Sequence, residues 1–537
     1  MVLDTSPLAA VAHLSTVHAP VSITSSPWSD FGRGGAMGNR WDGEKYPGGF
    51  GPTKLSTPDY WTLRTRSAQL FTENLYARGL VRRLITVEIN TGLLLDAQPN
   101  DELLPGVTER NAEEWTEGVE NRFEIWTSSP KLCDFERRRT FSAIQQEARR
   151  EAIIGGDILV TLRADRRTGL PMVKLIRGDR VKNPLDQKIM NERNIVNGVE
   201  LDADERQIAY WVRGKEGTST RVPARGPKSG KRLAWLEYGT DARVDQVRGI
   251  PLLGLVLQSL KELDRYRDSE QRAATVNSLL AMFIEKNQPG AGTRPLSAGA
   301  TRNIQIESTG LEGETREFNI SEQWPGIALE ELAYGEVPKS FDTRRPNVNY
   351  PAFEAAVIAA IAWANEIPPE VLVLQFQSNY SASKAANSAL REYVTKTRAA
   401  FGSTFCQPIY TEWLLAETLS ERIAAPGLVS AWRDPLAFTE FGAWTRAGWG
   451  GPVQPSIELK KDIEAYGRAI ELHLISRDRA SKDLFGVRWS KVMKRRAKEE
   501  RVLQGFREEF GLEAEPDAPS VSSGARILEV VRDELEA

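Results

Sequence analysis

Cysteine and histidine are the residues that this sequence has least of. Its 537 residues include only Cys133 and Cys406 and three histidines. Two thiols are too few for a disulfide framework or a thiolate metal site, and they fit a reducing compartment. His13 and His18 fall in a polar N-terminal stretch, which leaves His473 alone for the folded part. Histidine-based triads, zinc sites and general bases are therefore close to excluded.

A long apolar run and an excess of charge of one sign are also lacking. The most apolar window, 355–364, is far shorter than the ~20 residues that span a bilayer. The N-terminus has no basic and apolar signal-peptide pattern, so we expect a soluble protein without a membrane partner. Lys and Arg number 70 against 73 Asp and Glu, a net charge of −3. A protein that coats nucleic acid with a basic face would carry a clear excess of Lys and Arg.

What the sequence does contain is enough apolar material for a sizeable core, with 41% hydrophobic and 27% charged residues. Residues 1–57 are rich in Ser, Thr, Pro and Gly and predict a flexible N-terminal arm. Residues 513–537 predict a polar C-terminal tail. Between them, stretches of helical and of strand periodicity predict an α+β fold.

Hydrophobic periodicity and the positions of glycine and proline predict the elements. Gly79 is expected to end the first helix, and Pro251 is expected to begin a very long one. The expected helices run over 57–78, 108–127, 140–154, 251–285, 351–365, 384–423, 456–475, 478–485 and 488–510. The expected strands run over 157–164, 171–177, 195–201, 207–213 and 232–238, with short ones at 303–307 and 314–320. Residues 214–231 are basic and predict a loop. Most of the 14 tryptophans are expected to fill a core.

Two short motifs resemble catalytic signatures without completing them. Gly226-Pro-Lys-Ser-Gly-Lys231 is one residue short of a phosphate-binding loop, has Arg232 where Ser or Thr would hold Mg²⁺, and precedes a strand. An exposed basic loop is the simpler interpretation. Ser381-Ala-Ser-Lys384 has the S-x-x-K spacing of penicillin-binding enzymes but lacks their partner motifs. There a helix start capped by Ser381 or Ser383 is the simpler interpretation.

Three further patterns are equally weak indications of a site for a dinucleotide or for Mg²⁺. Gly290-Ala-Gly292 lacks the third glycine of a dinucleotide site. Asp202 and Asp204 fit a hairpin turn, where aspartate is favoured. Asp264 and Asp268 lie among Lys and Arg on a helix and fit a salt-linked surface. We therefore expect no enzyme, no cofactor and no metal.

At this point the sequence resembles the lambda-like portal proteins of tailed bacteriophages. Each matching stretch is weak by itself, but their order and spacing from about 60 to 510 are specific. The stretches are 64–70, 76–79, Gly156-Asp157, 176–181, 195–200, 208–212, 247–253, 260–266, 272–274, 353–370 and 379–385.

The resemblance implies a ring, usually of twelve copies, with parts that have family names. A wing would comprise 58–250 and 384–455. Stem helices would comprise 251–285 and 351–373, and a clip 286–350. A tunnel loop would comprise 374–383, and a crown 456–512.

The resemblance also implies partners and site residues. The ring would sit at one vertex of the capsid, with host cytoplasm as its place of assembly, and contact the major capsid protein or scaffold. Double-stranded DNA would pass through it without sequence specificity, packaged by the large terminase and later ejected through a head–tail adaptor. The tunnel-loop residues would be Gln375, Phe376, Gln377, Ser378, Asn379, Tyr380, Ser381 and Lys384. The stem residues would be Lys261, Arg265 and Arg272, and the clip residues Arg294, Arg302 and Glu312.

Residues 374–383 carry no charge, which suits a sliding contact because phosphate contacts by Lys and Arg raise affinity and friction. An ordinary surface loop is the alternative for this segment. For the whole chain the alternatives are a head–tail adaptor, a minor capsid protein or a phage-encoded hydrolase. The hydrolase would need a clustered acidic or nucleophilic site, which the sequence does not offer.

Overall fold

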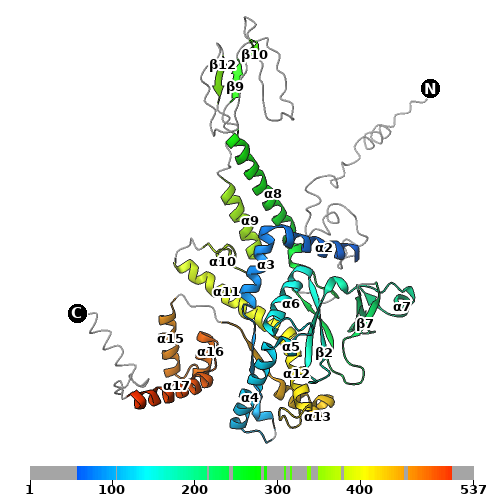
Figure 1. The fold of residues 1–537 in the computed structure, drawn as a ribbon, viewed down its shortest axis with the longest axis vertical. Helices are drawn as coiled ribbons and strands as arrows, with labels where there is room; N and C mark the ends of the chain where they lie inside the picture. The colour runs from blue at the N-terminus through cyan, green and yellow to red at the C-terminus, as the bar shows by residue number, and fades with distance from the viewer. Residues whose placement is uncertain are drawn as a thin grey trace, which may run out of the picture.

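A computed structural model describes residues 57–279 apart from 105, 215–216 and 241–245, four short strands between 283 and 339, residues 349–375, and residues 380–510 apart from 453–457. A body of helices and small sheets carries a pair of helices, α8 and α9, that rise toward the short strands (Figure 1). The class is the expected α+β. No helix in the described part is long and apolar enough to cross a membrane.

The first two helices are α2 (Thr57–Glu73) and α3 (Leu75–Glu88). The sequence predicted a single helix ending at Gly79, and this was wrong. Asn74 is extended, and its side-chain oxygen accepts a hydrogen bond from Ala77 N at 2.9 Å, so it ends α2 and caps α3. Gly79 lies inside α3, where a helix tolerates a single glycine at modest cost.

A core of large aromatic side chains lies between α4 (Glu109–Ser128), α6 (Phe141–Gly155) and α12 (Gln407–Leu419). Phe123 is its centre, with ring centroids 5.3 Å from Trp126 and 5.0 Å from Trp413. The two expected helices, 108–127 and 140–154, are confirmed by α4 and α6. Core packing is confirmed for five tryptophans, all under a tenth exposed: Trp126, Trp211, Trp235, Trp413 and Trp444.

Two small antiparallel sheets pack on a second core. The first has the order β3-β2-β8 and the second the order β4-β5-β6-β7. Their bounds are β2 (Asp157–Ala164), β3 (Pro171–Arg177), β4 (Ile195–Val196), β5 (Val199–Leu201), β6 (Gln207–Arg213), β7 (Ser219–Pro223) and β8 (Ala234–Tyr238).

The expected strands are confirmed except in two places. The expected strand 195–201 is broken at Asn197-Gly198, because both residues have positive φ and form a tight turn. The expected loop 214–231 contains β7, whose residues pair with β6 across the whole of their length. A basic composition does not prevent a strand from forming when a neighbour supplies its hydrogen bonds.

The long helix α8 (Leu252–Leu279) begins where Pro251 predicted, but it ends before Glu285. Residues 283–286 form β9 instead and pair with β12 (Glu336–Lys339), so tertiary pairing overrides the helical periodicity there. Of the two expected short strands beyond, 314–320 contains β11 (Thr315–Arg316), paired with β10 (Ser308–Thr309). Residues 303–307 lie outside the described residues. The next helix, α9 (Tyr350–Ala364), is as expected.

A short α10 (Pro369–Val373) leads to α11 (Tyr380–Phe401), which was expected to begin only at Lys384. The π-helix η4 (Gly402–Cys406) joins α11 to α12. The expected helix 384–423 is therefore interrupted by a π turn and ends at Leu419. The π turn lies just before Pro408, where a proline lacks the N–H that a continuous α-helix needs.

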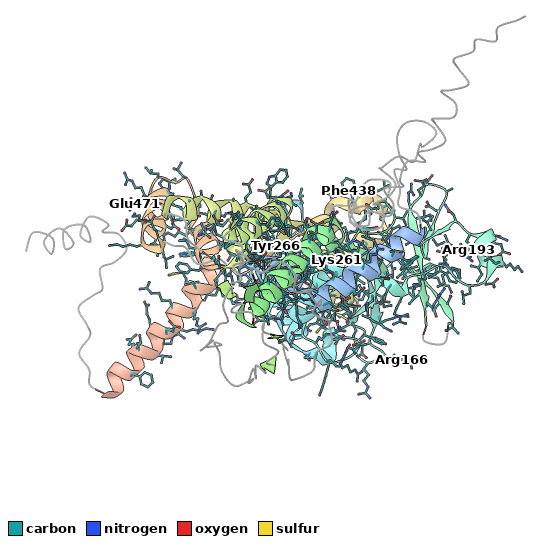
Figure 2. All side chains as sticks on the ribbon, turned by 90° about the horizontal axis from the view of Figure 1, so that it is seen from above. Arg166, Arg193, Lys261, Tyr266, Phe438 and Glu471 are labelled. Atoms are coloured by element: carbon teal, nitrogen blue, oxygen red, sulfur yellow. The ribbon has the colours of Figure 1, made fainter. Side chains whose placement is uncertain are left out.

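The C-terminal elements were expected from their helical pattern. They comprise α15 (Leu459–Glu471), α16 (Arg477–Phe485) and α17 (Trp489–Phe510), which extends away from the body (Figure 2). The remaining elements are short: β1 (Leu94–Ala97) paired with β13 (Ala447–Gly450), η2 (Asp101–Leu103), α5 (Pro130–Cys133), η3 (Gly178–Arg180), α7 (Gln187–Glu192), α13 (Leu428–Arg433), η5 (Pro435–Ala437) and α14 (Phe438–Thr445).

Candidate functional site

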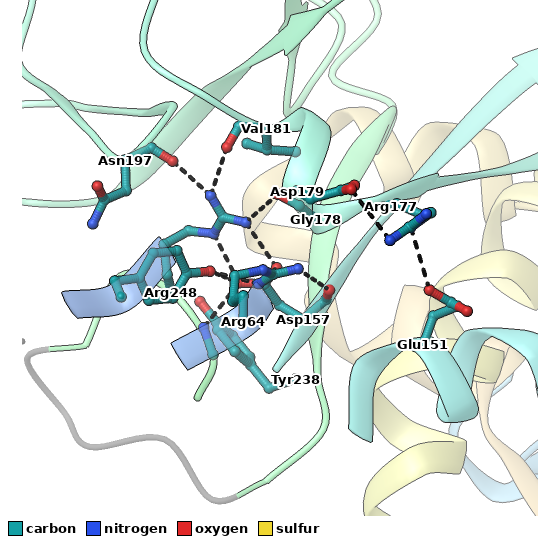
Figure 3. A network of polar contacts seen from close by, with 12 residues as sticks. Arg64, Glu151, Asp157, Arg177, Gly178, Asp179, Val181, Asn197, Tyr238 and Arg248 are labelled. Carbon is teal, nitrogen blue, oxygen red and sulfur yellow. Dashed lines mark hydrogen bonds and ion pairs between the residues drawn. The ribbon is translucent and has the colours of Figure 1, made fainter. Parts of the chain in front are cut away.

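A buried ion network joins the sheets to the base of α8 (Figure 3). Asp157, at the start of β2, accepts hydrogen bonds from Arg64 Nη1 at 2.9 Å and from Arg248 Nε at 2.7 Å. The backbone N–H of Gly249 donates to the same carboxylate at 2.9 Å. The three charged side chains are 0–6% exposed. One carboxylate therefore fixes a helix, a strand and the segment that leads into α8.

Arg248 extends the network to the linker between β3 and β5. Its guanidinium donates to the carbonyl oxygens of Gly178, Val181 and Asn197 at 2.7, 2.8 and 2.6 Å. An arginine offers five donors in a fixed fork, so it can hold several acceptors at once. Stretches of the sequence that lie far apart, at 64, 157, 178, 197 and 248, thus meet at one point.

The positive charges of the two arginines keep the Asp157 carboxyl ionised. Burial by itself would raise the pKa of the Asp157 carboxyl, but the charges of Arg248 and Arg64 outweigh burial and hold that pKa well below its usual range. Removing one partner of such a buried pair leaves the other charge uncompensated, which costs several kcal/mol. The network therefore stabilises the junction only as a complete set.

Two glycines let the backbone close around the network. Gly156 has φ of +89°, and a Cβ there would overlap the Gly249 carbonyl. A Cβ on Gly249 would in turn overlap the Gly156 carbonyl oxygen. Glycine is therefore required on both sides of this close approach. It places the segment before α8 directly against the end of α6.

The lower half of α8 is anchored by apolar packing and the upper half is not. Leu253, Val256, Leu257 and Leu260 are buried in one core with side chains of α3. Between Asp264 and Thr275 more than half of the side chains are exposed. The helix therefore leaves the body about midway, which matches its appearance in Figure 1.

The three predicted stem residues, Lys261, Arg265 and Arg272, are exposed on α8. Arg265 and Arg272 follow Lys261 by four and eleven residues, so all three lie on one face of the helix. Figure 2 shows Lys261 and Tyr266 from above, near the middle of the molecule. The structure thus brings these cations into one stripe rather than one cluster.

The partner helix α9 is apolar on almost every side. Its fifteen residues include one charged side chain, Glu354, which accepts a hydrogen bond from the Tyr76 hydroxyl at 2.6 Å. Phe353 packs on Tyr266 with ring centroids 5.0 Å apart and is still 44% exposed. Trp363 is 86% exposed. An apolar helix of this kind is normally buried against neighbours.

The predicted tunnel loop is described only at its ends. Gln375 is exposed, and its N–H donates to the Glu370 carbonyl at 3.1 Å. Residues 376–379 lie outside the described residues. Tyr380 and Ser381 belong to the first turn of α11, so the prediction that 374–383 is all loop was wrong at its end. Lys384 is exposed and pairs with Glu458 at 3.2 Å.

The clip residues Arg294, Arg302 and Glu312 lie outside the described residues, as does Gly290-Ala-Gly292. Ser381 and Ser383 lie within α11, which begins at Tyr380, so the prediction that one of them caps the helix was wrong. The basic turn at 226–231 precedes strand β8, as expected.

The two acidic pairs have structural roles. Asp202 accepts the backbone N–H groups of Asp204 and Arg206 in a hairpin turn. Asp264 and Asp268 both contact Arg267. Within the described ranges no three His, Cys, Asp or Glu side chains gather as a metal site would require.

Comparison with known proteins identifies the family of this chain. The family model "Phage portal protein, lambda family" matches residues 38–398, about two thirds of the chain. The chain therefore belongs to the lambda family of phage portal proteins. Proteins of this family are structural components of the bacteriophage virion. Membership favours a portal over the adaptor, minor capsid protein or hydrolase that remained open from the residues alone.

Two relatives are named as portal proteins. Portal protein B of Escherichia phage lambda is 21% identical over 461 residues, covering 82% of this chain and 85% of the relative. The probable portal protein of Halomonas phage phiHAP-1 is 24% identical over 259 residues, covering 46% of this chain and 45% of the relative.

Two solved structures are similar in fold to this chain. They are the neck of a native GTA particle computed with C12 symmetry, with a TM-score of 0.42, and the neck of an empty GTA particle computed with C6 symmetry, with a TM-score of 0.39. Their sequences are 12% and 13% identical, and in each case the match covers 81% of this chain and 95% of the other.

The sequence did not single out Asp157, Arg64 or Arg248 as a joint site. A signal was present, since Gly156-Asp157 and Arg248-Gly249 each pair a glycine with a charged residue beside the expected start of an element. What the sequence could not supply was their proximity, because Arg64 and Arg248 are separated by 184 positions.

Proposed function

We propose that this chain forms a closed ring of twelve copies at one capsid vertex and that double-stranded DNA enters and leaves the capsid through the ring. α8 and α9 form the stem, residues 286–350 the clip, and residues 374–379 with the start of α11 the contact with DNA. The remaining body forms the wing, and α15–α17 form the crown. Membership of the portal family supports this assignment.

The exposed apolar surface of α9 carries the proposal. A helix with one charge, a Trp that is 86% exposed and a Phe that is 44% exposed is costly in water, at roughly 25 cal/mol for each Å² of apolar surface. A neighbouring copy that packs α8 against this helix removes that cost. Closed rings repeat one such heterologous contact at every subunit.

The charge distribution suits passage rather than retention of DNA. The proposed contact segment 374–379 contains no charged residue, and Lys384 is paired with Glu458. Polar groups meet the phosphate backbone without sequence preference, while each unpaired cation adds salt-dependent affinity. Lys261, Arg265 and Arg272 lie on the stem, outside this segment.

The partners follow from the assignment. The clip is the surface for the large terminase during packaging and for the head–tail adaptor afterwards, and the wing is the surface for the major capsid protein or scaffold. The ring assembles in the host cytoplasm and remains in the virion. The family-level role is structural, with no reaction assigned to any side chain.

The test is a charge placed on α9. Trp363→Lys should shift the purified protein from the ring to monomers and small oligomers in size-exclusion chromatography with light scattering. Leu436→Lys is the matched control, because Leu436 is also 86% exposed but lies in η5, far from α9. Rings of full mass from Trp363→Lys would contradict the assignment of α9 to the subunit contact.

A further inference from the structure

A pocket of about 340 Å³ opens beside the sheets, away from α8 and α9. Its walls come from three places. These are Gln207 and Tyr210 on β6, Ala224 and Arg225 after β7, and Arg232 followed by Ala234, Trp235, Leu236 and Tyr238 of β8. Tyr210, Ala234 and Leu236 also belong to the core between the two sheets. The pocket is therefore built on rigid strands and lies at the end of a packed core.

One wall of the pocket is held by a continuous chain of hydrogen bonds. The Tyr210 hydroxyl donates to Gln207 Oε1 at 3.0 Å, Gln207 Nε2 donates to the Tyr238 hydroxyl at 2.9 Å, and Tyr238 donates to the Val247 carbonyl at 3.0 Å. Each of these side chains already has its partner. The wall is held in place without needing a ligand, which leaves recognition to the other side of the pocket.

The other side presents guanidinium groups with few acceptors. Arg232 lies over the Trp235 ring, with Cζ 4.8 Å from its centroid, and its guanidinium has no hydrogen bond or ion pair in the described part. Burial lowers the pKa of Arg232, which reflects a cation that is partly removed from water. Arg225, at the exposed rim, makes one long bond to the Gly230 carbonyl, 3.4 Å.

The charges around the pocket do not balance. The charges of Arg225, Lys231 and Arg232 act on the buried carboxyl of Glu412, and those of Arg149 and Arg232 act on the buried carboxyl of Glu237. Glu412 accepts the backbone N–H of Arg232 at 2.6 Å, and Glu237 accepts the Thr404 hydroxyl at 2.8 Å, so neither holds a guanidinium. Burial raises the pKa of both carboxyl groups. The pocket therefore keeps net positive charge.

Trp235 gives an independent observation. It lines the pocket, packs in the aromatic core around Phe123 and is only 4% exposed, yet its indole N–H is buried with no acceptor among the described residues. Buried donors are nearly always paired, and among the described indoles only those of Trp126 and Trp413 share this lack of an acceptor. An acceptor that reached both this N–H and the Arg232 guanidinium would satisfy the two groups together.

We propose that this pocket binds a small oxyanion, a carboxylate or phosphate group, held by Arg232 with help from Arg225 and the Trp235 indole. Planar guanidinium groups match such anions in two-pronged contacts. A pocket of this volume admits a small polyanion or one acidic side chain and excludes a double helix. The site is thus separate from any passage for DNA and does not depend on it.

The test is calorimetric titration of the full chain, in its assembled form, with three probes: citrate, inorganic phosphate and acetylated tetraglutamate. Binding of citrate or phosphate indicates a free small anion, and binding of tetraglutamate alone indicates an acidic segment of another chain. Either result supports the proposal. Absence of heat with all three probes overturns it.

Variants locate the binding. Arg232→Met keeps the apolar stem over Trp235 but removes the charge, and it should weaken binding ~10-fold or more, as charge-assisted hydrogen bonds imply. Arg232→Lys should restore part of it. Arg206→Met is the control, because Arg206 pairs with Asp204 on an exposed turn. Equal affinity in Arg232→Met and Arg206→Met would overturn the proposal.

Far-ultraviolet circular dichroism and the assembled mass show whether Arg232→Met folds. If it does not, a second variant tests the proposal. Trp235→Phe keeps the ring and removes only the indole N–H. If the N–H holds the anion, affinity falls several-fold, while the melting temperature without ligand stays equal or rises because an orphaned donor is gone. Unchanged affinity in both Trp235→Phe and Arg232→Lys would count against the site.

Discussion

At Asp157 a single carboxylate pairs with two buried arginines, so its charge is central to the junction below α8. Asp157→Asn keeps the shape but removes the charge. We expect a loss of about 3–5 kcal/mol in the free energy of unfolding, because Arg64 and Arg248 become uncompensated. The measurement is urea unfolding followed by circular dichroism.

Asp204→Asn is the matched control for this prediction. Asp204 is exposed and its side chain pairs with the neighbouring, exposed Arg206, so its effect should stay within about 0.5 kcal/mol. Equal midpoints for the two variants would show that the buried network does not stabilise the fold.

Glu237 makes stability depend on pH. Burial raises the pKa of this carboxyl to about 7 from 4.5, and its Oε2 has no hydrogen-bond partner in the described part of the chain. Between these two values the folded chain binds a proton that the unfolded chain releases. Stability from this group is therefore present below about pH 4.5 and is lost as pH rises to about 7, by about 3 kcal/mol in total.

The measurement for this prediction is the unfolding midpoint of wild type and Glu237→Gln from pH 5 to pH 8. The neutral amide has no proton to lose, so the wild-type decline should be missing from the variant. Glu205→Gln, at an exposed turn position, should follow wild type. A variant curve parallel to the wild-type curve would show that Glu237 titrates normally.

At the scale of elements, the sequence predicted what local pattern decides. Strands β2 and β3 and helices α4 and α6 were found within a residue or two, because alternating or helical periodicity and clear turns bound them. The misses have two causes. β9 depends on a contact from far along the chain, because β12 pairs with it, and β7 forms because β6 pairs with it. The break between α2 and α3 and the break in the strand 195–201 are local, because Asn74 caps α3 and Asn197-Gly198 form a turn.

The same limit applied to the candidate site. The long paired helices could be predicted, and so could the absence of charge in 374–383. Two features needed the fold: the convergence of Arg64 and Arg248 on Asp157, and the exposure of Trp363, which the sequence shows only as one more apolar residue in α9.

The segment between α10 and α11 supports a prediction about DNA. Gln375→Lys adds one cation per subunit to the proposed contact, so the assembled ring should bind a short DNA duplex more tightly. The logarithm of its affinity should also fall more steeply with the logarithm of salt concentration, because phosphate contacts release counterions. Fluorescence anisotropy of labelled duplex across a salt series measures both.

Gln187→Lys provides the comparison for this test. Gln187 is exposed at the start of α7, at the far end of the sheets from α10 (Figure 1). It adds the same charge away from the proposed passage and should leave the salt slope close to wild type. Equal slopes for the two variants would contradict the placement of Gln375 beside DNA.

At the scale of the whole molecule, exposed apolar side chains include those of two regions that matter for assembly. One is α9, and the other comprises α15–α17 with their connections, where Ile463, Leu474 and Phe485 are 45–77% exposed. Polar contacts such as the ion pair between Arg488 and Asp96 fasten the second region to the body without burying it. Repeated lateral contacts in a ring would cover both.

The most direct test of this account is the mass of the purified protein in native mass spectrometry. Twelve copies of 59.9 kDa give about 720 kDa, and a closed ring predicts one dominant species there that persists across protein concentrations. A stable monomer or dimer at every salt concentration would contradict the ring, and with it the channel that the ring is proposed to form.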